Sequence, residues 1–227
     1  MQKSKTTRFH AIGSRPLKRT RVKRRPDQEM VPPKTSADYI LFYKPFGVLS
    51  QFTSSEERPC LKDFGPFPRD VYPVGRLDQD SEGLLLLTND TDINHRLTDP
   101  RFEHEKTYLV QVEGVPTEDS IMALRNGVLV QGRKTLPAKV TPLQSPPSLP
   151  PRGVPIRVRK TIPTSWLEMT LREGRNRQIR KMTAAVGFPT LRLVRIRVAS
   201  LTTGKLGPGE YRNLTLPEIS ALRELVI

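Results

Sequence analysis

The stretch VGRLDQDSEGLLLLT, residues 74–88, places a short acidic loop directly before four consecutive leucines. Residues 83–88 have the length and continuous hydrophobicity of a strand that is buried on both faces. Residues 71–74 form a shorter apolar segment on the other side of the loop. The stretch therefore predicts two strands joined by an acidic loop, which the strands hold in place while it remains accessible.

Further strands and helices are expected on both sides of this stretch. Residues 39–43, YILFY, have the character of a buried strand that Pro45 and Gly47 end. Three other segments alternate apolar and polar side chains as strands do: 106–113, 167–172 and 191–201. Four helices are expected from caps and spacing. One is capped by Asn89 or Asp90 and runs to residue 97, and one is capped by Thr117 and runs to about residue 125. The others are 176–186 and a helix that opens at a Thr215–Glu218 capping box.

The order of these elements predicts the fold class. Strands outnumber helices, most connections resemble hairpins, and strand and helix do not alternate regularly. We therefore expect an α+β fold over residues 38–227, with a mixed, mostly antiparallel β-sheet core and flanking helices. Residues 1–37 hold eleven Lys or Arg and two acids, few large apolar residues and no periodicity. This tail is predicted to be a disordered basic arm.

Composition narrows the class of partner. The chain has 38 Lys or Arg and 23 acids, a formal net charge of +15, which favours a polyanion. No apolar run is long enough to span a bilayer, and the N-terminus lacks the apolar stretch of a secretory signal. The single cysteine, Cys60, favours a reducing compartment, and no Cys or His cluster has zinc-site spacing. A nucleic-acid partner in the cytoplasm is expected, with no membrane association.

The acidic loop carries three acids within five positions: Asp78, Asp80 and Glu82. It could be a solvated turn, or it could bind a divalent metal, as in a nuclease. The calcium-loop pattern is matched only superficially, since its fifth position is Glu and its twelfth is Asn89. Alternatively, one acid is a lone catalytic carboxylate, with Arg76 beside it to hold an anion or to replace a displaced base. Composition alone leaves the solvated and the catalytic interpretations open.

Two further features suit an RNA substrate. Residues 172–181 carry five Arg or Lys and one acid, and helical spacing sets Arg177, Arg180 and Lys181 on one side. Such a face could bind phosphates or reach a carboxylate, although a solvated helix face is the ordinary explanation. Tyr108 lies within the predicted strand 106–113 and could be a core aromatic or a ring on which a flipped base stacks.

Together these segments resemble the motifs of the pseudouridine synthases. Residues 75–86 are similar to the catalytic motif of the branch that contains the ribosomal small-subunit enzyme A and its large-subunit relatives. Residues 44–47 (KPFG), 105–108 (EKTY) and 173–180 (EGRNRQIR) match that branch in order and character. Members usually begin with a small S4-type RNA-binding domain. Only the basic tail stands there in this chain, so no S4 domain is expected.

The resemblance implies roles for individual residues. Asp78 corresponds to the nucleophilic aspartate of the family, and Tyr108 to the tyrosine that stacks on the target uracil and can act as general base. Arg180 corresponds to the arginine paired with the aspartate, with Arg177, one turn away, as the alternative. The residues expected to contact the substrate are Arg76, Ile179, Lys106 and Arg177.

The implied activity is isomerisation of a specific uridine to pseudouridine in ribosomal RNA, with large-subunit 23S rRNA as the expected substrate. The nucleotide is flipped, its glycosidic bond is cleaved with the help of the aspartate, and the uracil is rejoined through C5. This chemistry needs no metal, nucleotide or redox cofactor, and a monomer is expected.

A non-catalytic RNA-binding protein would explain the charge but not the acidic loop. A methyltransferase using Cys60 would need a glycine-rich cofactor loop, which the sequence lacks.

Overall fold

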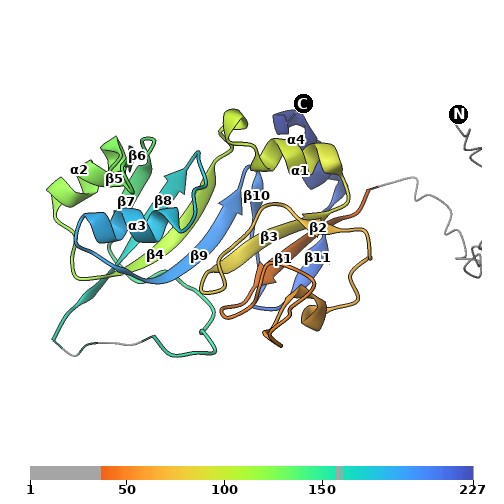
Figure 1. Cartoon of the computed structure of the whole chain (residues 1–227), viewed down its shortest axis with the longest axis horizontal. Helices are drawn as coiled ribbons and strands as arrows, with labels where there is room; N and C mark the ends of the chain where they lie inside the picture. The colour runs from red at the N-terminus through yellow and green to blue at the C-terminus, as the bar shows by residue number, and fades with distance from the viewer. Residues whose placement is uncertain (1–36, 157–158, 160, 227) are drawn as a thin grey trace, which may run out of the picture. The chain divides into compact units, whose positions relative to one another are not determined.

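The main sheet follows the order β11 (Tyr211–Asn213), β1 (Tyr39–Lys44), β3 (Glu82–Thr88), β9 (Thr190–Val198), β4 (Lys106–Glu113), β8 (Thr164–Leu171) and β7 (Lys139–Leu143), as Figure 1 shows. β2 (Tyr72–Pro73) pairs with β3, and β10 (Leu201–Thr202) pairs with β9. β5 (Leu129–Val130) and β6 (Arg133–Lys134) form a separate hairpin. The computed structural model describes residues 37–156, 159 and 161–226, and within them every strand pairing except β3–β9 is antiparallel. The expected α+β class is confirmed; the basic tail lies outside the described residues, apart from Ala37.

The continuous apolar runs of β1 and β3 are explained by burial on both faces of the sheet. Every residue of the two strands is buried. Alternate side chains point into different cores, so Leu84 and Leu86 belong to one apolar cluster and Leu85 and Leu87 to another. A strand with a core on each side has no face for polar residues, which is why its sequence does not alternate.

The β4–β8–β9 half of the sheet has its own core, which includes Val110, Met169 and Ile179. It meets the β1–β3 half where two residue pairs join β3 to β9 in parallel: Glu82 with Val194, and Gly83 with Arg195. Gly83 has a φ of +102°, and a Cβ built there would lie 2.2 Å from the carbonyl oxygen of Arg195. Only glycine therefore fits at this junction between the two halves.

Helices flank both halves of the sheet: α1 (Thr91–Thr98), α2 (Glu118–Asn126), α3 (Gln178–Ala185) and α4 (Leu216–Val226). Short 3₁₀ turns lie at η1 (Leu61–Phe64) and η2 (Pro100–Phe102). In Figure 1, α2 and α3 lie beside the β4–β8 half, and α1 and α4 lie at the other half. Among the described helices, none has both the length and the apolarity needed to cross a bilayer.

The caps predicted from the sequence are present. The carboxylate of Asp90 accepts hydrogen bonds from the amides of Asp92 and Ile93 at the start of α1. The hydroxyl of Thr117 accepts from the amide of Ser120 in α2. The amide of Thr215 donates to the Glu218 carboxylate at 2.8 Å and the amide of Glu218 donates to the Thr215 hydroxyl at 3.4 Å, so both bonds of the expected capping box are present before α4. α3 begins later than expected, at Gln178, because the residue before it leaves the helical conformation.

Candidate active site

The acidic loop between β2 and β3 is fixed by the loop that follows β1. The hydroxyl of Ser50 donates to the carbonyl of Leu77 at 2.8 Å and accepts from the amide of Leu77 at 3.1 Å. The amide of Gly47 donates to the carbonyl of Gln79 at 2.8 Å, and the Gln79 side chain donates back to the Gly47 carbonyl at 3.0 Å. Both neighbours of Asp78 are thus held, so the backbone of Asp78 has a defined position.

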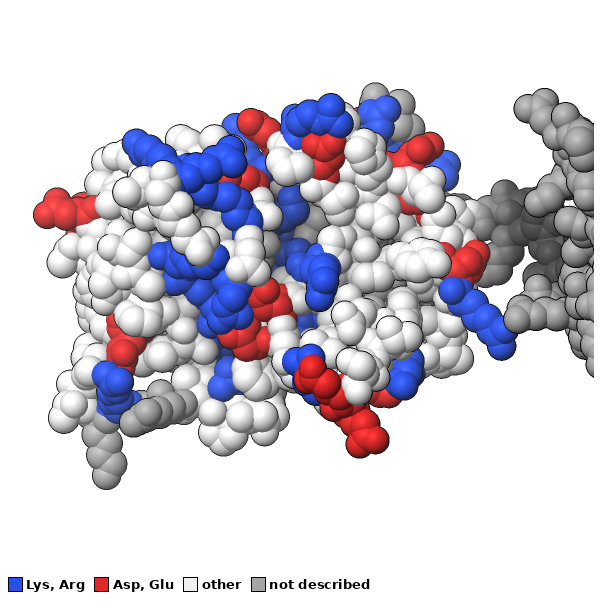
Figure 2. All heavy atoms as spheres, viewed as in Figure 1, with Lys and Arg blue, Asp and Glu red and all other residues white. Residues whose placement is uncertain are grey.

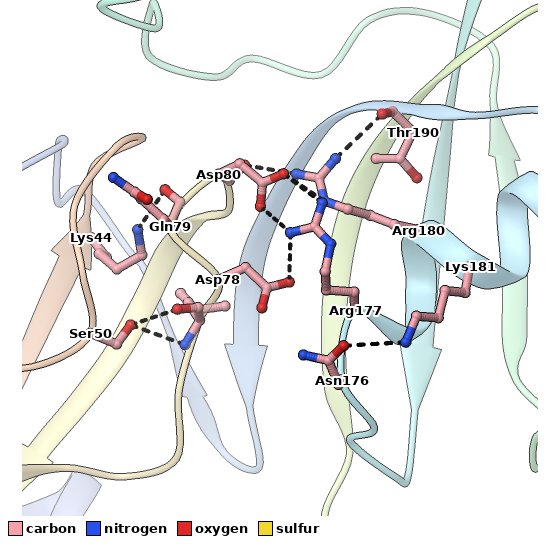
Figure 3. Close-up of polar contacts among 11 residues, drawn as sticks. Lys44, Ser50, Asp78, Gln79, Asp80, Asn176, Arg177, Arg180, Lys181 and Thr190 are labelled. Atoms are coloured by element: carbon pink, nitrogen blue, oxygen red, sulfur yellow. Dashed lines mark hydrogen bonds and ion pairs between the residues drawn. The ribbon is translucent and has the colours of Figure 1, made fainter. Parts of the chain in front are cut away.

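A buried cation supports the same loop. Lys44 is wholly buried, and its Nζ donates to the carbonyls of Pro45 and Val48 at 2.9 and 2.7 Å. It also donates to the carbonyl of Gln79 at 3.3 Å, the bond drawn in Figure 3. The three carbonyl acceptors match the three N–H groups of the ammonium form. Burial lowers the pKa of Lys44 to about 7, although the nearby acids of the loop oppose that shift. The lysine of the KPFG segment therefore joins two loops and places positive charge behind the acidic one.

Two arginines from the α3 region reach the acidic loop from the opposite side (Figure 3). Arg177 donates from both terminal nitrogens to the two carboxylate oxygens of Asp80, each at 2.8 Å, and its Nη1 lies 3.6 Å from Oδ2 of Asp78. Arg180 donates to the backbone carbonyls of Asp80 at 2.7 Å and Thr190 at 3.3 Å, and its Nε lies 3.3 Å from the Asp80 carboxylate. Of the two arginines expected as possible partners of Asp78, Arg177 is the one whose guanidinium lies within 4.0 Å of the Asp78 carboxylate in the described structure, whereas Arg180 contacts Asp80.

The backbone at Arg177 accounts for this difference. Arg177 is the N-cap of α3 and has left-handed dihedral angles, φ 52° and ψ 36°, which non-glycine residues rarely adopt. Such a conformation costs about 1–3 kcal/mol and tends to occur at functional sites. It releases Arg177 from the helical spacing, so that its side chain reaches Asp78 and Asp80 while Arg180 stays behind the loop.

The three acids of the loop have different surroundings. Partial burial acts to raise the pKa of the Asp80 carboxyl, but the hydrogen bonds from Arg177 and the charge of Arg180 outweigh it and hold the pKa below its ordinary value. Glu82 is buried and accepts from Arg192 at 2.9 and 2.8 Å. Only Asp78 of the three lines the adjacent cleft, where its side chain is 31% exposed. The geometry fits a lone carboxylate rather than a three-acid metal site.

The cleft next to Asp78 has a volume of about 600 Å³, within the usual range of about 300–1,000 Å³ for ligand pockets. Six of the seven residues predicted to act on the substrate line it: Arg76, Asp78, Lys106, Tyr108, Arg177 and Ile179. The seventh, Arg180, is not among its lining residues. The sequence motifs, which lie far apart along the chain, are therefore brought to one cavity by the sheet.

The cleft is strongly positive. Six Lys or Arg residues and two acids, Asp78 and Glu173, line it, and Figure 2 shows blue side chains in and around the hollow at the centre of the face. Such a surface suits a phosphate-bearing ligand. One of the cations, Arg195 on β9, was not predicted as a site residue. The sequence does not single it out, because the same strand also carries Arg192 and Arg197.

Comparison with known proteins gives a consistent result. The family described as RNA pseudouridylate synthase matches residues 38–185. Ribosomal large subunit pseudouridine synthase E of Xanthomonas campestris pv. campestris is 53% identical over 175 residues, which cover 76% of this chain and 93% of that protein. The protein of the same name from Vibrio vulnificus is 48% identical over 209 residues, covering 91% of this chain and 88% of that protein.

A solved structure described as a pseudouridylate synthase is similar in fold, with a TM-score of 0.66 and 31% identity. The match covers 82% of this chain and 74% of that chain.

Proposed function

This chain belongs to the RNA pseudouridylate synthase family, and from that premise we propose that it isomerises one uridine of large-subunit ribosomal RNA to pseudouridine. The observation that carries the proposal is the position of Asp78. It is the one acid of its loop that lines a cleft, it lies 3.6 Å from a guanidinium, and Tyr108 lines the same cleft. Relatives named for the large subunit support the choice of RNA.

Asp78 acts as the anion that the reaction needs. Its carboxylate either attacks C1′ of the flipped nucleotide or removes the 2′ proton to leave a glycal, and in both routes the N1–C1′ bond breaks. Arg177 supplies the adjacent positive charge. The loop contacts that fix Leu77 and Gln79 keep the carboxylate in place, so little reorganisation is needed when the nucleotide enters.

Tyr108 and Ile179 hold the uracil. The ring of Tyr108 offers a stacking face, and its hydroxyl helps to take the C5 proton that is lost after C5 joins C1′. Ile179 is buried and borders the cleft, so it closes one side of the uracil pocket. Arg180 acts indirectly, because its bond to the Asp80 carbonyl positions the acidic loop.

The RNA is bound mainly through its phosphates. Flipping a nucleotide costs a few kcal/mol, which contacts from the basic lining of the cleft and from the basic tail offset. Arg76 is exposed at the cleft and fills the space that the flipped base leaves. The enzyme works as a monomer in the cytoplasm, without membrane association, metal or cofactor.

The test is a change at Asp78 with a matched control. Tritium release from rRNA transcripts labelled at C5 of uridine measures turnover, and mapping of the product identifies the modified uridine. Asp78→Asn is expected to abolish release while RNA binding is retained, because only the catalytic carboxylate is lost. Asp119→Asn changes an exposed aspartate of α2 in the same way and is expected to keep full turnover. Turnover by Asp78→Asn, or no tritium release by the wild type on any rRNA, would refute the proposal.

A further inference from the structure

Two cations line the cleft from neighbouring strands, Arg195 on β9 and Lys106 on β4. Arg195 is only 4% exposed, and its Nε donates to the carbonyl of Leu84 at 2.8 Å, which fixes the plane of the guanidinium. The Nζ of Lys106 donates to the carbonyl of His104 at 3.1 Å. Each side chain is therefore anchored by one backbone bond, and further N–H groups remain to be used.

Neither cation has a carboxylate within 4.0 Å in the part of the chain that the structure describes. They are close enough to affect each other: burial, and secondly the charge of Arg195, lower the pKa of Lys106 to about 8. Placing two like charges in a partly desolvated cleft without an acid between them is unfavourable. An electron-rich ligand would relieve that cost.

The ladder between β4 and β9 places Tyr108 directly opposite Arg195. Side chains of residues that are directly opposite in an antiparallel pair lie about 4.5–5.5 Å apart at Cβ. A uracil stacked on Tyr108 would therefore have its edge near the guanidinium of Arg195, with Lys106 two residues away on the same strand as the tyrosine.

We infer that Arg195, together with Lys106, forms the binding site for the carbonyl oxygens O2 and O4 of the flipped uracil. This inference rests on the proposed uridine isomerisation. It gives Arg195 two tasks: it selects a base with two carbonyl acceptors, and it stabilises the uracil anion formed on cleavage.

The chemistry of the reaction explains why cations are needed at this position. When the N1–C1′ bond breaks, both bonding electrons stay with the uracil. Asp78 makes up the electron deficit of the sugar, either by bonding to C1′ or by removing the 2′ proton. The resulting negative charge spreads over N1, O2, O4 and C5. Preorganised donors aimed at such developing charge are among the largest contributions to catalysis.

The turning of the uracil fits the same arrangement. Bringing C5 to the position of N1 requires a half-turn about the axis through N3 and C6, and this half-turn exchanges O2 with O4. Donors placed for the two oxygens before cleavage are therefore placed for them afterwards as well. C5 then donates its electron pair to C1′, and this either breaks the bond between Asp78 and C1′ or, in the glycal route, is accompanied by return of the proton from Asp78 to C2′. The C5 proton goes to Tyr108 as general base and N1 takes up a proton, so the product is an isomer.

The test compares uridine with thiouridine in the same enzyme preparation. Oligoribonucleotides centred on the uridine that the wild type modifies carry uridine, 2-thiouridine or 4-thiouridine, each deuterated at C5. Loss of deuterium gives the single-turnover rate. Sulfur is a weaker hydrogen-bond acceptor than oxygen, so the ratio of the uridine rate to the thiouridine rate reports the contact. This ratio does not depend on the fraction of enzyme that is correctly folded.

Arg195→Met is expected to lower the uridine rate by about 10²–10³-fold, as loss of one anion-stabilising donor does. For at least one of the two thiouridines, the rate ratio is expected to fall about tenfold or more relative to the wild type, which corresponds to one charge-assisted hydrogen bond. Arg195→Lys keeps the positive charge, so its ratio of the uridine rate to the thiouridine rate should lie between those of the wild type and Arg195→Met. Arg197→Met, an exposed arginine of the same strand, serves as control and should keep the wild-type ratio.

Equal ratios in the wild type and Arg195→Met for both thiouridines would overturn the inference while leaving the proposed function intact. A wild type that removes no deuterium from any uridine would instead overturn the proposed function itself. The two failures are therefore distinguishable.

Discussion

Gly83→Ala tests whether the junction of β3 with β9 holds the two halves of the sheet together. At a φ of +102°, a non-glycine residue costs about 1–2 kcal/mol. The new Cβ would also lie 2.2 Å from the carbonyl oxygen of Arg195 and 2.8 Å from its amide nitrogen. Both atoms belong to backbone, so the strands must move, and overpacking of this kind costs about 1–3 kcal/mol. The combined loss is about 2–5 kcal/mol.

The assay is thermal unfolding, since each kcal/mol lowers the Tm of a domain of this size by about 2–4 °C. Gly132→Ala is the matched control, because Gly132 also has a positive φ, +77°, but a Cβ added there would meet no atom within 4 Å. The two variants share the backbone strain, and only Gly83→Ala adds the clash. Gly83→Ala should therefore unfold at a lower temperature than the control. Equal Tm values would refute the argument that close approach at the junction requires glycine.

Three other changes test the support of the site and the role of charge. Glu82→Gln leaves Arg192 buried without its carboxylate and should lower the free energy of unfolding by about 3–5 kcal/mol in urea titrations. A loss no larger than that caused by Glu→Gln at an exposed position would contradict this. For Lys44, a pKa lowered to about 7 means that the folded state binds fewer protons than the unfolded state between about pH 7 and 10. The free energy of unfolding of the wild type should therefore rise relative to that of Lys44→Met as the pH increases through this window, and a constant difference would be evidence against the shift. Removal of residues 1–36 should weaken rRNA binding and flatten its dependence on salt, whereas an unchanged slope would show that the tail makes no phosphate contacts.

Features that depend on a few neighbouring residues could be predicted from the sequence. The cap at Asp90 and the box at Thr215 rely on short-range hydrogen bonds, and both are present. The uninterrupted apolar character of β3 predicted a strand buried on both faces, which requires no knowledge of its neighbours. The position of Asp78 on an accessible loop between two strands follows from the same local pattern.

Features that depend on register and on single backbone angles could not be predicted. Arg195 contributes to the cleft because β9 pairs with β4 in one register, and a shift by one residue would turn its side chain to the other face. The partner of Asp78 depends on the left-handed conformation of Arg177, which no local pattern indicated. Lys44 gave no sign of burial, because lysine is almost never buried without acceptors that come from elsewhere in the chain.

The pairing of β1 with β11 has a consequence for biosynthesis. Ile40 of β1 lies beside Asn213 of β11, so this edge of the sheet is completed only after residue 213 has been translated. Contacts between residues so distant in sequence form slowly, because a long loop must close first. The nascent enzyme should therefore gain its native sheet only after β11 leaves the ribosome, and a chain truncated before β11 would expose β1 as an unpaired edge open to aggregation.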